Sequence, residues 1–396
     1  MALRITKLTA RQELDSQGNW TVEASLFCGR IAVHASIPKG ESAGTHEARA
    51  LPAEKAVRNI LRIIAPRLKG LNPAEQEKID ALLLKLDGTS NKRRLGANAI
   101  LAASVACARA GALAGNIPLW RHLRRIGGFK VPGRPPRLLV NLIEGGMHAG
   151  NGLDFQEYLV IPEGKSIRDE VDIAVRLYHA LRAYLVRAKG PSAAHAGDEG
   201  GFAPLFKDYR EPFVVMRRVA QALGLERKIE FGLDAAASGI RRPPRELMAR
   251  YARLIREFPL IYLEDPFGED DFRNFATLNR GWGGSVCITG DDLTTTNVSR
   301  MEKAAREEAV RGVIIKPNQI GTVTEAIQAV RLARTYGWMV IASHRGSETN
   351  DDFIADFAYG VGADAIKLGA PRRGERIAKY NRLLEIEGRV LSRRKG

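Results

Sequence analysis

The sequence predicts an α/β protein in which an N-terminal α+β domain precedes a β/α barrel. The main observation is a series of apolar stretches in the second half of the chain, each ending in one polar residue and following the last by 23 to 30 residues. One strand plus one helix per step produces this interval. A second observation is a Gly/Pro-rich stretch, GGFKVPGRPPR, upstream of the series. The polar residues that end the stretches are Asp234, Glu264, Asp291, Lys316, His344 and Lys367.

The first part of the chain contains strands followed by helices. Between Leu8 and Ser36 apolar and polar residues alternate, and Gly18 and Gly29 divide this run into strands. Further along, apolar residues recur at helical spacing, and the last helix is rich in alanine, which suits close packing in a core. The predicted helices span residues 52–70, 74–86 and 96–115. This order predicts an α+β domain over residues 1–126.

Residues 127–137 form the predicted linker, because their prolines exclude a helix interior and a central strand. The barrel domain therefore covers residues 138–396. After the linker, LLVNLIEGG and FQEYLVIP are typical of strands, and Ile167–Lys189 is typical of a long helix.

Composition limits the class of protein. The chain has 396 residues, 45% of them hydrophobic, which allows two domains and a large core. Its first residues lack the apolar core of a signal peptide, and no stretch approaches the roughly 20 apolar residues of a membrane span, so we expect a cytoplasmic protein without membrane contact. Three distant cysteines indicate neither disulfides nor a zinc site.

The net charge of +16 comes mostly from arginine. Such an excess raises the affinity for any polyanion, including nucleic acid. The basic clusters, however, lack the interleaved aromatic residues of a surface on which bases stack. We therefore favour a solvated basic surface over nucleic-acid binding.

Three of the strand-end residues are carboxylates from successive strands of the predicted barrel. Residues at the strand ends of such barrels meet at one mouth. Asp234, Glu264 and Asp291 would therefore present oxygen ligands to one point, a set that suits Mg²⁺. The acids that follow two of them, Asp265 and Asp292, are placed to orient ligands or to accept bonds from nearby backbone. The sequence thus predicts a magnesium site at the mouth.

A lysine and several acids complete the predicted site. Lys316 either reaches a core ion pair or projects into the mouth, where nearby cations depress its pKa, and we favour the mouth. On the opposite side of the ring, GDEGG places Glu199 in an exposed turn, and FQEYL places Gln156 and Glu157 near a strand end. An acid opposite a lysine suits removal of a proton from carbon on one face and protonation of a leaving hydroxyl on the other. Further candidates for hydrogen bonding and anion binding are His148, His344 and Arg345. A single histidine is more often an ordinary hydrogen-bonded residue than a catalytic one.

Eight motifs of the chain together resemble those of the enolase (phosphopyruvate hydratase) family, in order and spacing, from about Leu8 to Glu387. They are LDGTSNKRRLGANAILA, GGMHAG, GDEGGFAP, LEDPFGEDD, GDDLTTTN, IIKPNQIGT, SHRGSET and IKLGAP. The resemblance implies an enolase-type TIM-like barrel with irregular first elements, capped by an α+β domain. It also implies a lyase that dehydrates 2-phosphoglycerate to phosphoenolpyruvate, reversibly, in glycolysis and gluconeogenesis. Enolase-superfamily sites in general use a Lys or His base with one or two Mg²⁺ ions.

The resemblance further implies a role for each candidate residue. Lys316 would be the base, and Glu199, with Glu157 beside it, the acid on the departing hydroxyl. Lys367 would bind the substrate carboxylate, and Arg345 would clamp the phosphate. Two Mg²⁺ ions would be present with substrate bound. The first would be held by Asp234, Glu264 and Asp291, and the second with help from Ser42 in the loop over residues 38–48. The other residues lining the pocket would be His148, Gln156 and His344.

Several positions depart from the family pattern. Gly346 precedes Ser347 where the family has Ser then Gly, and we expect Ser347 to compensate near the phosphate. Gln17 and Trp20 replace an arginine and a proline, and Lys39 stands where serine is usual. Two loops are shortened, one between residues 48 and 54 and one after residue 238. A smaller lid excludes water less well, which lowers turnover or admits a different acid.

The resemblance implies a homodimer with two reciprocal Arg–Glu pairs across its interface. Arg11 and Glu375 preserve one pair. The other would place Glu23 against Glu385, where arginine is usual, so like charges would meet unless Arg382 compensates. We expect a homodimer.

Two other functions compete with the enolase reaction. One is a superfamily enzyme that removes a proton from another carboxylic acid, which the Gly346–Ser347 order and the shorter lid favour. The other is a non-catalytic relative that binds polyanions through its basic surface. A need for phosphate in tight binding separates the first from enolase, and a steep salt dependence without Mg²⁺ dependence identifies the second.

Overall fold

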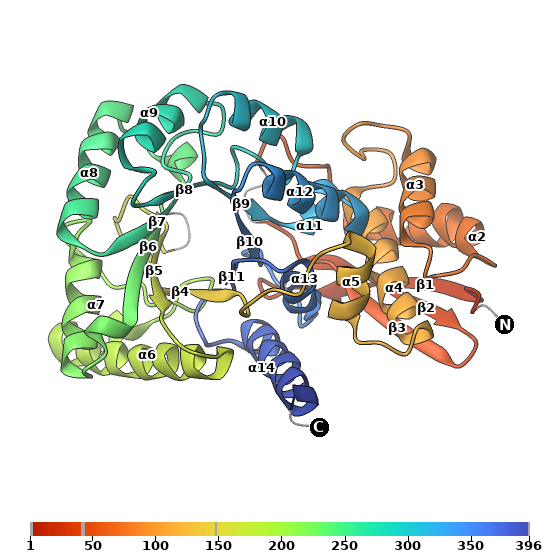
Figure 1. Cartoon of the computed structure of the whole chain (residues 1–396), viewed down its shortest axis with the longest axis horizontal. Coiled ribbons are helices and arrows are strands. Elements are labelled where there is room, and N and C mark those ends of the chain that lie inside the picture. Colours follow the sequence, from red (N-terminus) through yellow and green to blue (C-terminus); the bar gives the residue numbers. More distant parts are fainter. Residues whose placement is uncertain (1–2, 41–43, 147–148, 395–396) are drawn as a thin grey trace.

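The computed structural model describes residues 3–40, 44–146 and 149–394. It shows a small sheet with helices beside a larger barrel that is surrounded by helices (Figure 1). The α/β fold class predicted from the sequence is therefore confirmed.

The N-terminal part begins with a three-stranded antiparallel sheet in the order β1-β2-β3. Its strands are β1 (Lys7–Leu14), β2 (Trp20–Cys28) and β3 (Ile31–Ser36). Val22, Ala24 and Leu26 of β2 are fully buried, whereas Glu23 and Ser25 between them are partly exposed. The alternation in the sequence thus reflects one face packed on a core and one face near solvent.

The predicted helices follow the sheet, with one irregularity. The helices are α1 (Ala53–Asn59), η1 (Ile60–Ile64), α2 (Ala65–Leu68), α3 (Gln76–Asp87), α4 (Ala97–Ala114) and α5 (Leu119–Gly127). The first predicted helix contains a π-helical turn, η1, between α1 and α2. α4 packs on β2 and β3. It is the one helix in the described part of the chain that is long and apolar enough to span a membrane, and most of it is buried inside the protein.

The second part is a closed barrel of eight strands in the order β10-β11-β4-β5-β6-β7-β8-β9. The strands are β4 (Arg137–Glu144), β5 (Glu157–Pro162), β6 (Ile229–Asp234), β7 (Leu260–Glu264), β8 (Cys287–Gly290), β9 (Gly312–Ile315), β10 (Met339–Ser343) and β11 (Ala365–Lys367). β5 runs antiparallel to both β4 and β6, and the other neighbouring strands are parallel. This reversal is the irregular start that the resemblance implied.

Helices surround the barrel (Figure 1). They are α6 (Ile167–Lys189), η3 (Pro191–Ala194), α7 (Glu211–Ala222), η4 (Glu226–Lys228), η5 (Ala237–Gly239), α8 (Pro244–Glu257), α9 (Phe272–Trp282), α10 (Val298–Arg306), α11 (Pro317–Ile320), α12 (Val323–Thr335), α13 (Phe353–Val361) and α14 (Gly374–Arg394). Apolar side chains fill the barrel interior below the mouth. They come from Leu139, Leu159, Ile161, Tyr262, Ile314, Ile341 and Ala365.

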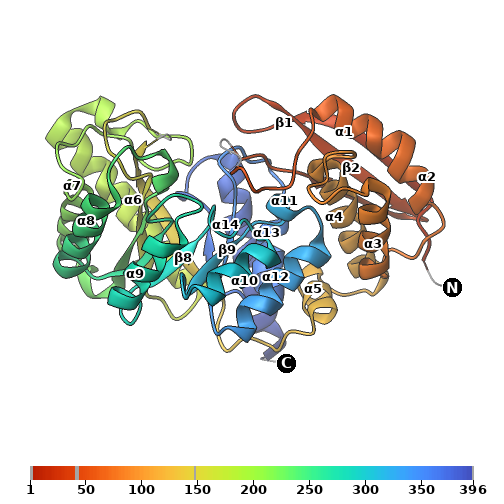
Figure 2. The same cartoon turned by 90° about the horizontal axis from the view of Figure 1, so that it is seen from above.

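The segment between β3 and α1 reaches from the N-terminal part toward the barrel beside α11 (Figure 2). Asn318 Nδ2 donates to the Pro38 carbonyl at 3.1 Å, and the Ala48 N–H donates to the Gln319 carbonyl at 2.8 Å. The N-terminal part therefore contributes a loop to the barrel mouth.

The boundary between the two parts lies in a region that also contacts the barrel. α5 ends at Gly127 and β4 begins at Arg137, with no helix or strand between them. α5 nevertheless packs on α13, where Trp120 and Tyr359 meet edge to face with ring centroids 5.2 Å apart. The division at residues 127–137 stays a prediction.

Candidate active site

The six polar residues that end the apolar stretches meet at the barrel mouth. Three are the last residues of β6, β7 and β11, and three directly follow β8, β9 and β10. Five of them line a cavity of about 290 Å³. The sixth, Glu264, is fully buried, and its carboxylate contacts Lys367. Parallel strands end at the same rim, which explains why residues far apart in sequence converge here.

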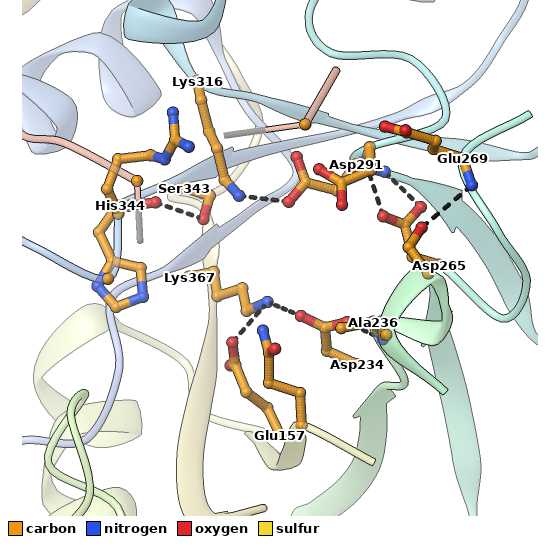
Figure 3. Close-up of a pocket in the computed structure, with 18 of the residues that line it drawn as sticks. Glu157, Asp234, Ala236, Asp265, Glu269, Asp291, Lys316, Ser343, His344 and Lys367 are labelled. Atoms are coloured by element: carbon orange, nitrogen blue, oxygen red, sulfur yellow. Dashed lines mark hydrogen bonds and ion pairs between the residues drawn. The ribbon is translucent and has the colours of Figure 1, made fainter. Parts of the chain in front are cut away.

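Lys367 lies in a buried cluster of carboxylates (Figure 3). Its Nζ lies 2.7 Å from Asp234 Oδ2 and 3.0 Å from Glu264 Oε2. It also lies 3.1 Å from Glu157 Oε1. Burial lowers the pKa of Lys367, but the attraction of these carboxylates, Asp234 first, raises it well above its ordinary value. Lys367 is therefore a fixed cation at the floor of the cavity.

The same carboxylates have capacity for a further cation. Glu264 Oε1 and Glu157 Oε2 are buried without a hydrogen-bond donor among the described residues. Burial, and then repulsion from Asp234, raises the pKa of Glu264 to about 8. Buried carboxylate oxygens that lack donors are the ligands that Mg²⁺ prefers. Glu264 therefore offers an oxygen to the predicted metal site, whereas Asp234 and Asp291 are paired with Lys367 and Lys316 in this arrangement. Among the described residues at the mouth, the carboxylates that lie within 4.8 Å of one another are those of Asp265, Asp291 and Asp292.

Lys316 projects into the cavity and forms an ion pair with Asp291 (Figure 3). Gln319 Nε2 donates to the other oxygen of Asp291 at 2.9 Å. Burial, together with Arg345 and Lys367, lowers the pKa of Lys316, but Asp291 outweighs them and the net shift is upward. The expected depression of this pKa by nearby cations is therefore wrong for this arrangement, because Asp291 is closer than either cation.

Asp265 binds the backbone of the loop that carries Asp291, one of the two roles that the sequence predicted for the second acid of the pair. Its carboxylate accepts the N–H of Asp291 at 2.9 Å and the N–H of Asp292 at 2.7 Å. The backbone of Asp265 has φ of 39°, which an L-residue rarely adopts. Burial, and then repulsion from Asp291, raises the pKa of Asp292 to about 7. The strained turn thus places Asp291 at the mouth.

Glu199 lies beside the cavity among buried polar groups. Its Oε2 lies 3.2 Å from Nε2 of His344 and 3.4 Å from Nδ2 of Asn141. Glu144, which the sequence analysis did not identify, accepts the N–H groups of Glu199 and Gly201. Burial, and then repulsion from Glu199, raises the pKa of Glu144 to about 8. The carboxylate of Glu144 therefore fixes the backbone of the GDEGG turn.

Glu157 and Gln156 also line the cavity. Glu157 begins β5, which lies opposite β9 in the eight-stranded ring, so Glu157 faces Lys316 across the mouth. Burial, and then repulsion from Glu199, raises the pKa of Glu157 well above its ordinary value. The side opposite the lysine therefore carries a carboxyl group whose pKa shift favours its neutral form.

Arg345 lines the cavity and is held by a loop of the N-terminal part. Its two terminal nitrogens donate to the two oxygens of Glu47 at 2.8 and 3.0 Å, and Nη1 also donates to Asn318 Oδ1 at 3.0 Å. A Cβ on Gly40 would lie 1.8 Å from Nη2, so a larger residue there would displace the guanidinium from this position. The sequence analysis missed Glu47 and Asn318, although Asn318 belongs to the quoted motif IIKPNQIGT.

The two residues after Arg345 differ in their position relative to the cavity. Gly346 lines the cavity, but Ser347 does not. Ser347 instead pairs with Lys39 through the backbone, with N–H···O distances of 2.9 and 3.1 Å. The expectation that Ser347 compensates near the phosphate therefore has no support among the residues that the structure describes.

The segment that precedes the shortened loop over residues 48–54 is docked on the barrel. Thr45 Oγ1 donates to Glu269 Oε1 at 2.7 Å, and His46 Nε2 lies 3.1 Å from Asp270 Oδ1. Gly44 and Thr45 line the cavity. The predicted site residues Ser42 and His148 lie outside the described residues.

Comparison with known proteins gives matches over nearly the whole chain. The family model of the enolase N-terminal domain matches residues 5–123, and that of the enolase C-terminal TIM barrel domain matches residues 135–242 and 241–395. The enolase of Methanopyrus kandleri is 42% identical over 412 residues, which cover 97% of this chain and 95% of the relative. The enolase of Methanocaldococcus jannaschii is 41% identical over 406 residues, with the same coverage. Enolase B of Dictyostelium discoideum is 37% identical over 420 residues, again covering 97% and 95%.

Proposed function

The chain belongs to the enolase family, and from this premise we propose that it dehydrates 2-phosphoglycerate to phosphoenolpyruvate with Mg²⁺. The observation that carries the proposal is the division of the cavity: Lys316 follows β9, and Glu157 begins the opposite strand β5, with Glu199 beside it. A base and an acid on opposite sides of a substrate are what an elimination of water requires.

Asp234, Glu264 and Asp291 would hold the first Mg²⁺, and Ser42 would help to hold a second. When bound, Mg²⁺ supplies positive charge that offsets these carboxylates and stabilises the charge developing on the substrate carboxylate. Lys367, fixed among acids, supplies a second cation for that carboxylate.

Lys316 acts as the base on the carbon next to the carboxylate. The ion pair with Asp291 raises the pKa of Lys316, so Lys316 would act as a base more readily if Asp291 were held by the metal instead. Arg345 and Lys367, which both lower the pKa of Lys316, would then act without the opposing attraction of Asp291, and Glu264 would still raise it. The base is thereby activated together with formation of the metal site.

The acid side and the binding groups complete the reaction. Glu199 gives a proton to the departing hydroxyl, and Glu157, whose pKa is raised by burial, reinforces this side. Arg345 would bind the phosphate with the N–H groups that Glu47 and Asn318 do not use. Gln156 and His344 line the remaining pocket, the family resemblance adds His148 as a substrate-binding residue, and the docked loop at Thr45 limits access of water.

A second candidate is dehydration of, or proton removal from, another carboxylic acid by the same base. Ser347 does not line the cavity, but the matches to enolases over nearly the whole chain favour 2-phosphoglycerate over this alternative. A comparison of turnover with 2-phosphoglycerate and with glycerate, which lacks the phosphate, distinguishes the two candidate functions. We expect phosphoenolpyruvate from the former and no product from the latter. Equal turnover of both would overturn the assignment of Arg345 as a phosphate clamp.

We also propose a cytoplasmic homodimer. Within the chain, Arg11 Nε lies 2.8 Å from Glu23 Oε1, and Glu385 is paired with Arg382 and Arg389. Each of the like charges that would face each other at the interface already has a partner in its own chain. Glu375 Oε1 is buried and has no hydrogen-bond donor among the described residues, its contact with Arg376 Nε being 3.7 Å, which supports an additional partner there. Light scattering after gel filtration gives the mass, and a monomer at micromolar concentration would contradict the proposal.

A further inference from the structure

A buried guanidinium lies behind the site and has none of the roles assigned above. Arg376 lies in the first turn of α14 and is completely inaccessible to solvent. Among the described residues its one ion-pair contact is with Glu375, whose Oε1 lies 3.7 Å from Nε. Burying a charge without a close partner is unfavourable unless hydrogen bonds compensate for the lost water. The hydrogen bonds that compensate here indicate its role.

Arg376 binds three consecutive residues of the loop that follows β10. Its Nη1 lies 2.7 Å from Nδ1 of His344 and also donates to the carbonyl of Arg345. Its Nη2 donates to the carbonyl of Gly346. One side chain therefore fixes both the imidazole of His344 and the backbone that presents Arg345 to the cavity.

The contact also determines which nitrogen of His344 carries a proton. Arginine stays protonated and only donates hydrogen bonds, so Nδ1 of His344 must accept. Burial, opposed by Glu199 and reinforced by Arg376, lowers the pKa of His344 to about 4, so the ring is neutral near pH 7. A neutral ring that accepts at Nδ1 carries its hydrogen on Nε2. That nitrogen lies 3.2 Å from Glu199 Oε2, so its hydrogen faces this carboxylate, although the pair is not aligned as a hydrogen bond in this arrangement.

Close packing around the ring limits other arrangements. Gly369 has φ of 74°, and a Cβ there would lie 3.0 Å from Cε1 of His344 and 2.6 Å from the carbonyl of Glu199. The N–H of Ala370 donates to the same carbonyl at 3.0 Å. The imidazole and the Glu199 turn are thus packed against a segment that only glycine fits.

We propose that Arg376 is a positioning residue: it holds His344 in the Nε2–H tautomer, and His344 in turn orients the carboxyl group of Glu199 for proton transfer. The catalytic consequence rests on the proposed function. The tautomer does not, because it is a property of the protein without substrate.

The first test is ¹⁵N NMR of the full chain with labelled histidine, with the His344 signals assigned from the spectrum of His344→Gln. In the wild type we expect a neutral ring with hydrogen on Nε2 near pH 7. In Arg376→Met we expect loss of this single tautomer and uptake of a second proton at higher pH, because Glu199 and Glu348 then face the ring without the opposing guanidinium. Hydrogen on Nδ1, or a charged ring, in the wild type would overturn the proposal.

The second test is kinetic. For Arg376→Met we expect kcat on 2-phosphoglycerate to fall by about 10²-fold, the lower end of what acid catalysis contributes, with a smaller rise in KM. The acidic limb of the kcat profile should move to higher pH. Arg376→Lys keeps a buried donor and should recover part of kcat. A variant with lower stability but unchanged His344 signals, kcat and pH profile would show a merely structural role and refute the inference.

Arg334→Met is the matched control. Arg334 also ties a backbone carbonyl and a carboxylate, those of Gly362 and Asp364, but at the opposite end of the barrel. We expect its His344 signals and kcat to match the wild type. If Arg376→Met does not fold, the wild-type spectrum and Arg376→Lys decide the question. A wild type with the Nε2–H tautomer but no turnover would contradict the proposed function and leave the tautomer assignment standing.

Discussion

Replacing Lys316 by alanine tests the base directly. The side chain supplies the one ammonium of the described residues that lines the cavity on the β9 side, where it contacts Asp291. A positioned base contributes about 10²- to 10⁴-fold, so the barrier to proton removal should rise by roughly 3–5 kcal/mol. Loss of the ion pair leaves Asp291 with Gln319 as a donor, and we expect unfolding to become easier by about 1–3 kcal/mol, since Asp291 keeps contact with the cavity.

The assay for this variant is exchange of the substrate proton in deuterated water, followed by NMR in the presence of Mg²⁺. Wild type should exchange the proton next to the carboxylate, and Lys316→Ala should not. Because removal of Lys316 releases Asp291, calorimetry should show Mg²⁺ binding at least as tight as in the wild type. Lys78→Ala, an exposed lysine of α3, is the control. Exchange by folded Lys316→Ala within tenfold of the wild type would refute the reasoning.

Three further predictions follow from the site and the core. Glu199→Gln should keep proton exchange but lose dehydration by about 10²-fold or more, and a variant that loses both equally would contradict the separate role of the acid. Arg345→Lys keeps the charge but loses the paired bonds to Glu47, so KM for 2-phosphoglycerate should rise about 10- to 100-fold; an unchanged KM would remove it from phosphate binding. Burial lowers the pKa of His122 from 6.5 to about 4, so its unfolded form binds protons more strongly and stability is lost as pH falls from 6.5 toward 4. Denaturation at several pH values should show a loss of up to about 3 kcal/mol that His122→Gln reduces, and an equal pH dependence in both proteins would be the contrary result.

Much of the site could be predicted from the sequence because barrel topology fixes where strand-end residues lie. Each of Asp234, Glu264 and Lys367 is the single polar residue at the end of an apolar strand, and this position alone assigns it to the mouth before any contact is known. The secondary role of Asp265 was also predictable, since an acid that follows a ligand in a tight turn has few other groups to bind.

What the sequence did not predict depends on contacts between distant segments. Glu47 lies almost 300 residues from Arg345 and approaches it only because the N-terminal loop docks beside α11. Arg376 resembles any other helix arginine until the fold places it beneath the loop after β10. The direction of Ser347 follows from backbone pairing with Lys39, which residue type does not reveal. The sign of the Lys316 pKa shift depends on competing distances and not on which charges are present.

The most direct test of the central claim is formation of phosphoenolpyruvate from 2-phosphoglycerate, followed by ultraviolet absorbance with Mg²⁺ and again with a chelator. The account predicts turnover that depends on the metal, because Lys316 would act as a base more readily if Asp291 were held by the metal. No turnover by folded protein that binds Mg²⁺, or equal turnover with the chelator present, would contradict it.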